Sequence, residues 1–327
     1  MSDNIQARDR GSKEMSKNFI CELTQFGLVR FSGAEAQTFL HNQLSCDVAA
    51  LTRNKSTYGS YCTPKGRMLA TFLLWRSGED FFMQLPSPLR EPIQKQLTKF
   101  ILRSKVQAAD ASPHWTLLGV AGKDAAALVQ RTVGEVPKAV HEVVQAPEAM
   151  MINLPGERYE VVAAREKAPT VLMSLASGAE KADPDHWEWL DIRAGVPAIL
   201  PATREAFVPQ MVNLDLIGGV SLTKGCYPGQ EIVSRMHYRG TLKQRMYLAN
   251  IAGSDRPQPG EKLYSPDFGE QACGTIVNSA RSPAGGHDVL AVIQIASAEK
   301  GGLHWKTPQG PALTLKPLPY AVSTTEE

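Results

Sequence analysis

The sequence of 327 residues predicts an α+β fold with two ferredoxin-like halves and a small C-terminal β-barrel. A strand end, a small residue, a glycine and a helix follow one another at residues 31–39, and the same order recurs at residues 120–128. Each junction begins a run of strands and helices that reads as a βαββαβ unit, so the two runs predict a duplication. The last part of the chain has short apolar runs separated by Gly and Pro, which is typical of a small barrel.

The first half is predicted over residues 19–110, after a polar segment at residues 1–18 that is predicted to be a disordered tail. It begins with an alternating strand at residues 26–31, and the sequence from Ser32 to Glu35 fits a capping box for the helix that follows. Further strands are expected at residues 58–62, 67–75, 81–85 and 105–109. Ser87-Pro88 begins a second helix, whose apolar stripe is formed by Leu89, Ile93, Leu97, Phe100 and Ile101.

The second half is predicted over residues 111–240 and contains the segments that carry candidate chemistry. Residues 158–164 read as a strand, and residues 167–176 and 185–194 read as helices. A loop with a cysteine follows at residues 224–231. The barrel is then expected over residues 241–320, with a short tail at residues 321–327.

Composition excludes several classes of protein. The formal net charge of +2 gives no global case for binding nucleic acid or a membrane, so any such surface must be local. The five cysteines are odd in number and contain no CxxC pair, which argues against a disulfide framework and a zinc site. No stretch resembles a signal peptide or a membrane span. The sequence therefore predicts a cytoplasmic protein without a membrane partner or a stably bound metal.

The octapeptide Lys-Gly-Cys-Tyr-Pro-Gly-Gln-Glu at residues 224–231 is the clearest chemical motif. Pro228 and Gly229 suit the central positions of a tight turn, and Glu231 falls in the first turn of a predicted helix. Cys226 would then lie just before a helix N-terminus and close to Lys224, and both features favour a thiolate. The alternative is a buried, inert cysteine, and local chemistry alone leaves the two interpretations even.

These residues resemble the YgfZ family of folate-binding proteins, which are relatives of the aminomethyltransferase (T-protein) of the glycine cleavage system. The family signature K-G-C-[FY]-x-G-Q-E is matched at every defined position of residues 224–231. Weaker matches extend over much of the chain, at residues 39–48, 64–67, 194–197, 213–214, 235–240 and 317–320. The resemblance implies a T-protein-like folate-binding unit and a role in iron–sulfur cluster assembly or repair, and through it in tRNA modification.

The resemblance also implies a site for tetrahydrofolate or a related folate. The aromatic contacts of the family align with Phe26 and Trp187, although Phe26 replaces a tryptophan that some members carry and therefore lacks an indole N–H donor. Arg193 stands where relatives often have a glutamate, so it could pair with a folate carboxylate but not accept a hydrogen bond from a pterin. Trp187 as a core residue and Arg193 as a solvent-facing residue are the alternatives. The remaining predicted folate-binding residues are Tyr227, Gln230 and Glu231.

The sequence argues against aminomethyl transfer of the T-protein type, because that chemistry needs a carboxylate near the folate nitrogen. No Asp or Glu occurs between Asp47 and Glu79, where the family's acid is expected. Cations are instead frequent in this interval and around the cysteine, and a cleft between them would suit a polyglutamyl tail, RNA or an acidic protein. Ordinary solvated charge is the alternative for these cations: Arg53, Lys55, Lys65, Arg67, Arg76, Lys224, Arg235, Arg239, Lys243 and Arg245.

Three hypotheses follow. The first is a non-enzymatic accessory factor that acts on iron–sulfur assembly proteins or their client enzymes through a reactive Cys226, which Lys224 tunes. The second is a folate-dependent one-carbon transferase in which Cys226 or Asp215 replaces the missing acid. The third is a tRNA-binding module that uses the basic cleft.

Overall fold

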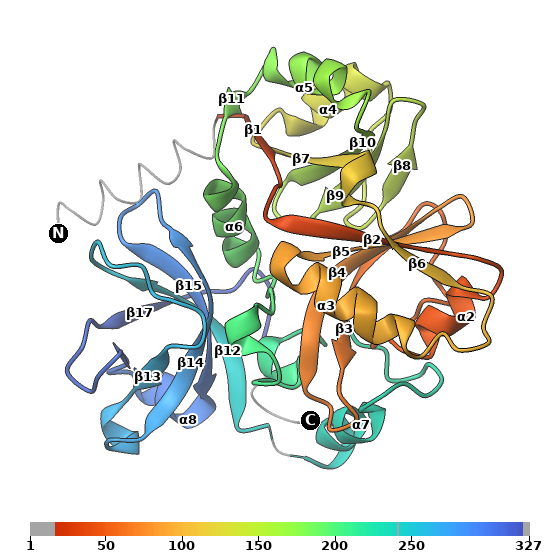
Figure 1. Ribbon diagram of the computed structural model, residues 1–327. Coiled ribbons are helices and arrows are strands. Elements are labelled where there is room, and N and C mark those ends of the chain that lie inside the picture. Colours follow the sequence, from red (N-terminus) through yellow and green to blue (C-terminus); the bar gives the residue numbers. More distant parts are fainter. Residues whose placement is uncertain (1–16, 241, 323–327) are drawn as a thin grey trace. The chain divides into compact units, whose positions relative to one another are not determined.

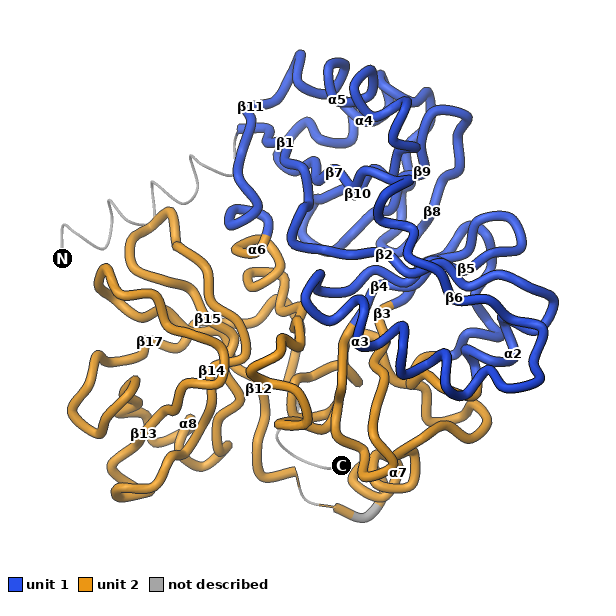
Figure 2. The backbone as a smooth tube through the Cα atoms, viewed as in Figure 1, with its two compact units in different colours: residues 1–41, 47–57, 72–187 blue, residues 42–46, 58–71, 188–327 orange. Residues whose placement is uncertain are grey.

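A computed structural model of the protein describes residues 17–240 and 242–322, so most of the predicted N-terminal tail lies outside the described residues. The chain forms two compact units, each assembled from separate stretches (Figure 2). Unit 1 comprises residues 1–41, 47–57 and 72–187, and unit 2 comprises residues 42–46, 58–71 and 188–327. The predicted domain boundaries at residues 110 and 240 stay predictions, since neither unit is one continuous stretch.

A five-stranded sheet with the order β3-β4-β5-β2-β6 contains the strands predicted in the first half (Figure 1). Gly33 connects β2 to α2 with a φ of +109°, and a Cβ at this position would clash with the carbonyl oxygen of Lys105. Glycine is therefore required at this strand–helix junction. The elements are β2 (Phe26–Ser32), α2 (Ala36–His41), β3 (Ser56–Cys62), β4 (Met68–Ser77), β5 (Asp80–Pro86), α3 (Ser87–Thr98) and β6 (Gln107–Asp110).

A six-stranded sheet with the order β11-β1-β7-β10-β9-β8 lies within unit 1. Gly122 precedes α4 with a φ of +118°, so the second predicted junction requires glycine for the same reason as the first. The elements are β1 (Phe19–Glu22), η1 (Ser112–His114), β7 (Trp115–Ala121), α4 (Ala125–Val133), β8 (Val143–Gln145), β9 (Ala149–Leu154), β10 (Arg158–Ala164), α5 (Ala168–Ala176) and β11 (Glu180–Lys181).

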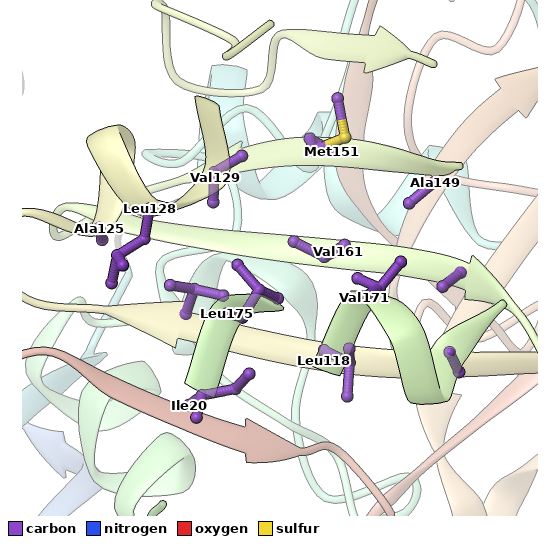
Figure 3. Packing of buried hydrophobic residues seen from close by; sticks show 13 residues of the cluster. Ile20, Leu118, Ala125, Leu128, Val129, Ala149, Met151, Val161, Val171 and Leu175 are labelled. Carbon is purple, nitrogen blue, oxygen red and sulfur yellow. The ribbon is translucent and has the colours of Figure 1, made fainter. Parts of the chain in front are cut away.

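One face of this sheet packs against α4 and α5 in a wholly apolar core. Figure 3 shows Leu118 and Val161 from the sheet meeting Leu128 of α4 and Leu175 of α5. The opposite face differs, because alternate residues of β10 are Arg158 and Glu160, and both are fully buried. The strand sequence therefore alternates between an apolar core and a buried polar layer.

The two sheets resemble each other in part of their strand order. The first contains β4-β5-β2-β6, and the second contains β9-β10-β7, after which β1 lies between β7 and β11. The overall α+β class predicted from the sequence is confirmed. The duplication of a ferredoxin-like unit stays a prediction, since β1 interrupts the second half.

Unit 2 contains a curled, half-barrel sheet with the order β16-β13-β14-β15-β12-β17 where the sequence predicts a C-terminal barrel. The buried carboxylate of Asp288 accepts hydrogen bonds from Trp189 Nε1 (2.9 Å), Asn250 Nδ2 (2.8 Å) and Lys316 Nζ (2.7 Å). These bonds hold the last turns of α6 against the sheet. The elements are α6 (Pro184–Arg193), η2 (Pro201–Thr203), η3 (Pro209–Val212), α7 (Gln230–Arg239), β12 (Gln244–Ile251), β13 (Lys262–Tyr264), η4 (Pro266–Phe268), β14 (Ala272–Arg281), β15 (His287–Gln294), α8 (Ile295–Lys300), β16 (His304–Trp305) and β17 (Leu313–Lys316).

The predicted apolar stripe of α3 is wrong at its end. The helix stops at Thr98, and Phe100 is 50% exposed rather than packed with Leu89, Ile93 and Leu97. The amides of Phe100 and Ile101 bond to carbonyls three residues back, which tightens the chain and turns Phe100 off the buried face. None of the helices in the described ranges is both long enough and apolar enough to cross a membrane.

His141 of unit 1 predicts a loss of stability in acid. Burial lowers the pKa of His141 to about 4, and its Nδ1 lies 3.0 Å from Ser56 Oγ. The unfolded chain, with a pKa of about 6.5, therefore takes up a proton first as the pH falls, and about 3 kcal/mol of stability is lost between pH 6.5 and 4. We expect His141→Asn, which tolerates the left-handed backbone at this position, to remove that loss in urea titrations across this range. Parallel curves for the two proteins would contradict the assignment.

Candidate functional site

Cys226 is the one exposed cysteine among the residues that the structure describes. It lies in the loop before α7, as the sequence predicts, and the alternative of a buried residue does not hold. The other four cysteines are buried, and burial raises the pKa of Cys62 to about 12 and that of Cys273 to about 11. Because the thiolate is the reactive form, accessible thiol chemistry is concentrated at Cys226.

Lys224 fixes the start of this loop. Its side chain is buried, and Nζ donates hydrogen bonds to the carbonyl oxygens of Leu44 (2.6 Å) and Cys46 (3.2 Å). The same ammonium lies 5.0 Å from the ring centroid of Tyr227, within the range of a cation–π contact. The contacts of Lys224 are thus structural, and its predicted influence on the Cys226 thiol stays a prediction.

Gln230 and Gly229 fix the end of the loop. The Gln230 side chain accepts a hydrogen bond from the amide of Tyr227 and donates one to the carbonyl of Lys224, both at 3.3 Å. Gly229 has a φ of +86°, and a Cβ there would lie 2.5 Å from the carbonyl oxygen of Thr63. No other residue fits without strain, so the turn before α7 packs directly on the turn at residues 63–66.

The other signature residues divide between the interior and the surface. Tyr227 is buried, and burial raises its pKa, while its hydroxyl has no hydrogen-bond partner among the described residues. Glu231 is exposed in the first turn of α7. Arg193 is also exposed, at the end of α6, which matches the solvent-facing alternative. The predicted contacts of these three residues with folate stay predictions.

Phe26 lines a cavity of about 310 Å³ within unit 1. Trp115 supplies a second aromatic ring, and Arg90 and Arg165 supply cations at the wall. Arg90 is also paired with Asp110 at 3.2 Å. The remaining lining residues are Glu22, Leu23, Thr24, Leu28, Ser87, Ser112, Thr116 and Leu117.

Unit 1 also contains a buried polar cluster that the sequence did not predict, and its side chains are not among those that line the cavity. Gln84 Nε2 donates to Glu160 Oε2 at 3.0 Å, and both side chains lie in the interior. Gln84 pairs with the cavity residue Leu28 across two strands, so the two side chains share one face. The signal was present in the sequence, because charged residues at 158 and 160 in an otherwise apolar strand must share a face.

Trp187 belongs to the same cluster. Its ring fills the space over Gly119, where a Cβ would clash with it, and the guanidinium carbon of Arg158 lies 4.8 Å from the ring centroid. Leu23 shares that space and also lines the cavity. Trp187 is therefore a packed residue one side chain away from the cavity, and a direct contact with folate stays a prediction.

The cations of the predicted basic cleft are largely engaged elsewhere. Arg53 and Arg76 both pair with Glu79, and Arg245 pairs with Asp215 at 2.9 Å. Arg67 Nη1 donates to the carbonyl of Ala206 at 2.7 Å. Lys65 and Arg235 are exposed, and no group of His, Cys, Asp and Glu side chains in the described part of the chain could hold a metal.

Comparison with known proteins decides the family. The chain is 32% identical over 309 residues to the tRNA-modifying protein YgfZ of Yersinia enterocolitica, and the match covers 93% of each protein. The chain belongs to the YgfZ family. The protein of the same name from Shigella boydii is 31% identical over 304 residues, which is 92% of each chain.

Two further comparisons support the fold of this YgfZ-family protein. The family model described as the GCVT N-terminal domain matches residues 13–156. The crystal structure of the glycine cleavage system aminomethyltransferase T from Bartonella henselae aligns with a TM-score of 0.78 over 96% of this chain and 89% of that chain. Because the identity in this alignment is 15%, it shows a shared fold only.

The signature lysine of the family makes a testable stability contribution. Lys224→Met keeps the apolar stem but leaves the carbonyls of Leu44 and Cys46 without their donor, so we expect a loss of about 1–3 kcal/mol. Urea unfolding measures the loss, and hydrogen exchange of residues 224–229 should quicken. Lys65→Met, at an exposed lysine of unit 2, should change stability by less than about 0.5 kcal/mol. Equal stability of both variants would contradict the positioning role of Lys224.

Proposed function

We propose that this protein is a folate-binding accessory factor for iron–sulfur cluster assembly or repair, and that it supports tRNA modification through a reactive Cys226. The observation that carries the proposal is an exposed thiol on a loop held at both ends, at Lys224 and at Gln230. A rigid loop keeps the thiol accessible while the other cysteines stay inert. The shared name of the relatives, tRNA-modifying protein, supports the link to tRNA.

Reduced folate is the cofactor that unit 1 suits best. The cavity of about 310 Å³ lies at the lower end of the range for small-molecule sites, about 300–1,000 Å³. A pterin ring is flat and presents N–H donors, so it needs aromatic walls and buried acceptors. Phe26 and Trp115 offer the walls. Glu160 offers a carboxylate, and Gln84 Oε1 is a buried acceptor without a partner among the described residues.

The cations of the cavity complete the fit. Arg90 and Arg165 line the wall and would pair with the carboxylates of the glutamate end of a folate. When bound, folate would supply one-carbon or redox chemistry, and the residues of unit 1 would bind and orient it. The turn at residues 63–67, where the acid of the T-protein is expected, contains no Asp or Glu.

Transferase activity is disfavoured by the groups that would have to replace the missing acid. Asp215 accepts two hydrogen bonds from Arg245 Nη1, of 2.9 and 3.1 Å. Its carboxylate is therefore already engaged in an ion pair with Arg245. A non-enzymatic role for the folate therefore agrees better with the structure than one-carbon transfer.

Folate binding is tested by calorimetric titration with 5-formyltetrahydrofolate. Gln84→Leu removes a buried acceptor from the proposed pterin end, and Glu160→Gln replaces a carboxylate oxygen with an N–H donor, so we expect about 10- to 100-fold weaker binding from each change. Met173→Ala, at an exposed side chain of α5, is the control and should bind as the unaltered protein does. If both variants bound folate with unchanged affinity while remaining folded, the folate site would have to lie elsewhere.

The role of Cys226 is tested by complementation in cells that lack their own YgfZ protein. Cys226→Ser should bind folate normally but fail to restore the activity of iron–sulfur enzymes, because the thiol is removed and the loop is kept. Thr223→Ala changes an exposed residue of the same loop and should complement fully. Full complementation by Cys226→Ser would overturn the proposal.

A further inference from the structure

The segment that joins α3 to β6 exposes two large apolar side chains in unit 1. Leu102 is 86% exposed and Phe100 is 50% exposed, although the sequence pattern places Phe100 in a buried stripe. Leu102 also has a φ of +45°, which is a strained conformation for a residue with a bulky side chain. A leucine held in solvent in this way contributes nothing to the core.

Cations surround these two side chains. Lys99, Arg103 and Lys105 are exposed, and none of their charged side-chain groups pairs with a carboxylate among the residues the structure describes. Lys95, one turn earlier on α3, differs because it is paired with Glu91 at 2.6 Å. The surface formed by residues 99–105 is called the α3–β6 tip below.

The α3–β6 tip is held in place from both sides. The amide of Phe100 bonds to the carbonyl of Leu97, and the amide of Ser104 bonds to the carbonyl of Ile101. At the far end the amide of Lys105 donates to Glu35 Oε2 at 2.6 Å. The Glu35 carboxylate thus accepts a hydrogen bond from the backbone of the tip and does not pair with one of its cations. The apolar and basic side chains are thus presented on a fixed support.

Several cations of the predicted basic cleft are engaged with other groups. Arg53 and Arg76 share the carboxylate of Glu79. Arg245 pairs with Asp215, and Lys224 is buried. With a net charge of only +2, the protein has little general attraction for polyanions. The tip combines three exposed cations within seven residues with two exposed apolar side chains, and this combination makes it a candidate for contact with RNA.

We propose that the α3–β6 tip is an RNA-contacting surface, on which Lys99, Arg103 and Lys105 bind phosphates and Phe100 and Leu102 pack against unstacked bases. This inference rests on the proposed link to tRNA, and it names the part of the chain that meets the RNA. Aromatic and aliphatic side chains next to cations are the combination that single-stranded or looped RNA engages, by stacking and by backbone pairing. The same chemistry could meet an anionic lipid surface, and the experiment separates the two.

Filter-binding or fluorescence titration with a tRNA transcript, at 50 to 200 mM salt, tests the proposal. The triple variant Lys99→Gln/Arg103→Gln/Lys105→Gln should bind more weakly at 50 mM salt and should reduce the slope of log K against log salt by about 2 to 3, so that its affinity relative to the unaltered protein changes about 16- to 64-fold between 50 and 200 mM salt. Phe100→Ala/Leu102→Ala should weaken binding about 10-fold with little change in slope, because stacking is not electrostatic. Both variants alter only exposed side chains, and urea unfolding confirms that they fold.

Two control variants remove cations at other places, and the first of them has the same charge change as the triple variant of the tip. Lys123→Gln/Lys138→Gln/Lys181→Gln removes three exposed cations from unit 1, and Lys65→Gln/Arg235→Gln removes two from unit 2. Both should bind the transcript as the unaltered protein does. Vesicles of phosphatidylcholine and phosphatidylglycerol (7:3) should not retain the protein in sedimentation.

The outcomes are distinct. Loss of RNA binding in the tip variants alone supports the proposal. Loss only in Lys65→Gln/Arg235→Gln, equal loss in all charge variants, absence of RNA binding, or retention on vesicles that depends on Leu102 would each overturn it. The complementation and folate titrations use Cys226, Gln84 and Glu160, so they test the proposed function even if the tip does not bind RNA.

Discussion

The contact between the Lys224 ammonium and the carbonyl oxygens of Leu44 and Cys46 is the constraint on which the candidate site depends. It joins the cysteine loop to a segment that is 180 residues earlier in the chain. A buried ammonium is unfavourable unless its donors are satisfied, so the loop and the segment must adopt these positions together. Cys226 is exposed two residues after this anchored lysine.

Unit 1 shows how one strand can serve two purposes. In β10 the alternation of side chains places Val161 and Ala163 in the apolar core and places Arg158 and Glu160 in a buried polar layer. Such a layer costs free energy unless its groups are paired, and the Gln84–Glu160 bond and the contact of Arg158 with Trp187 provide part of that pairing. The proposed folate site assigns the pterin ring to this polar layer.

The sequence was informative where a pattern has one physical solution. Gly33 and Gly122 predict strand–helix junctions because only glycine tolerates the backbone there, and the octapeptide predicts a turn before α7.

The sequence was less informative where several side chains compete for a role. The spacing of Phe100 fits a helical stripe, but the helix ends two residues earlier, and spacing does not reveal an end that lacks glycine or proline. Lys224 likewise reads as a neighbour of the thiol, whereas the fold turns its ammonium toward the carbonyls of Leu44 and Cys46. The pairing of Gln84 with Glu160 joins residues 76 apart, and no local pattern connects them.

The burial of every described cysteine except Cys226 has a practical consequence. We expect the folded protein to react with a thiol reagent at one cysteine, although its sequence contains five. A fluorophore, spin label or crosslinker can therefore be placed at residue 226 without any substitution. The number of thiols that react also reports the state of the chain, since one equivalent corresponds to the native protein and five to the unfolded one. The number of reactive thiols per chain thus measures the fraction of protein that is folded.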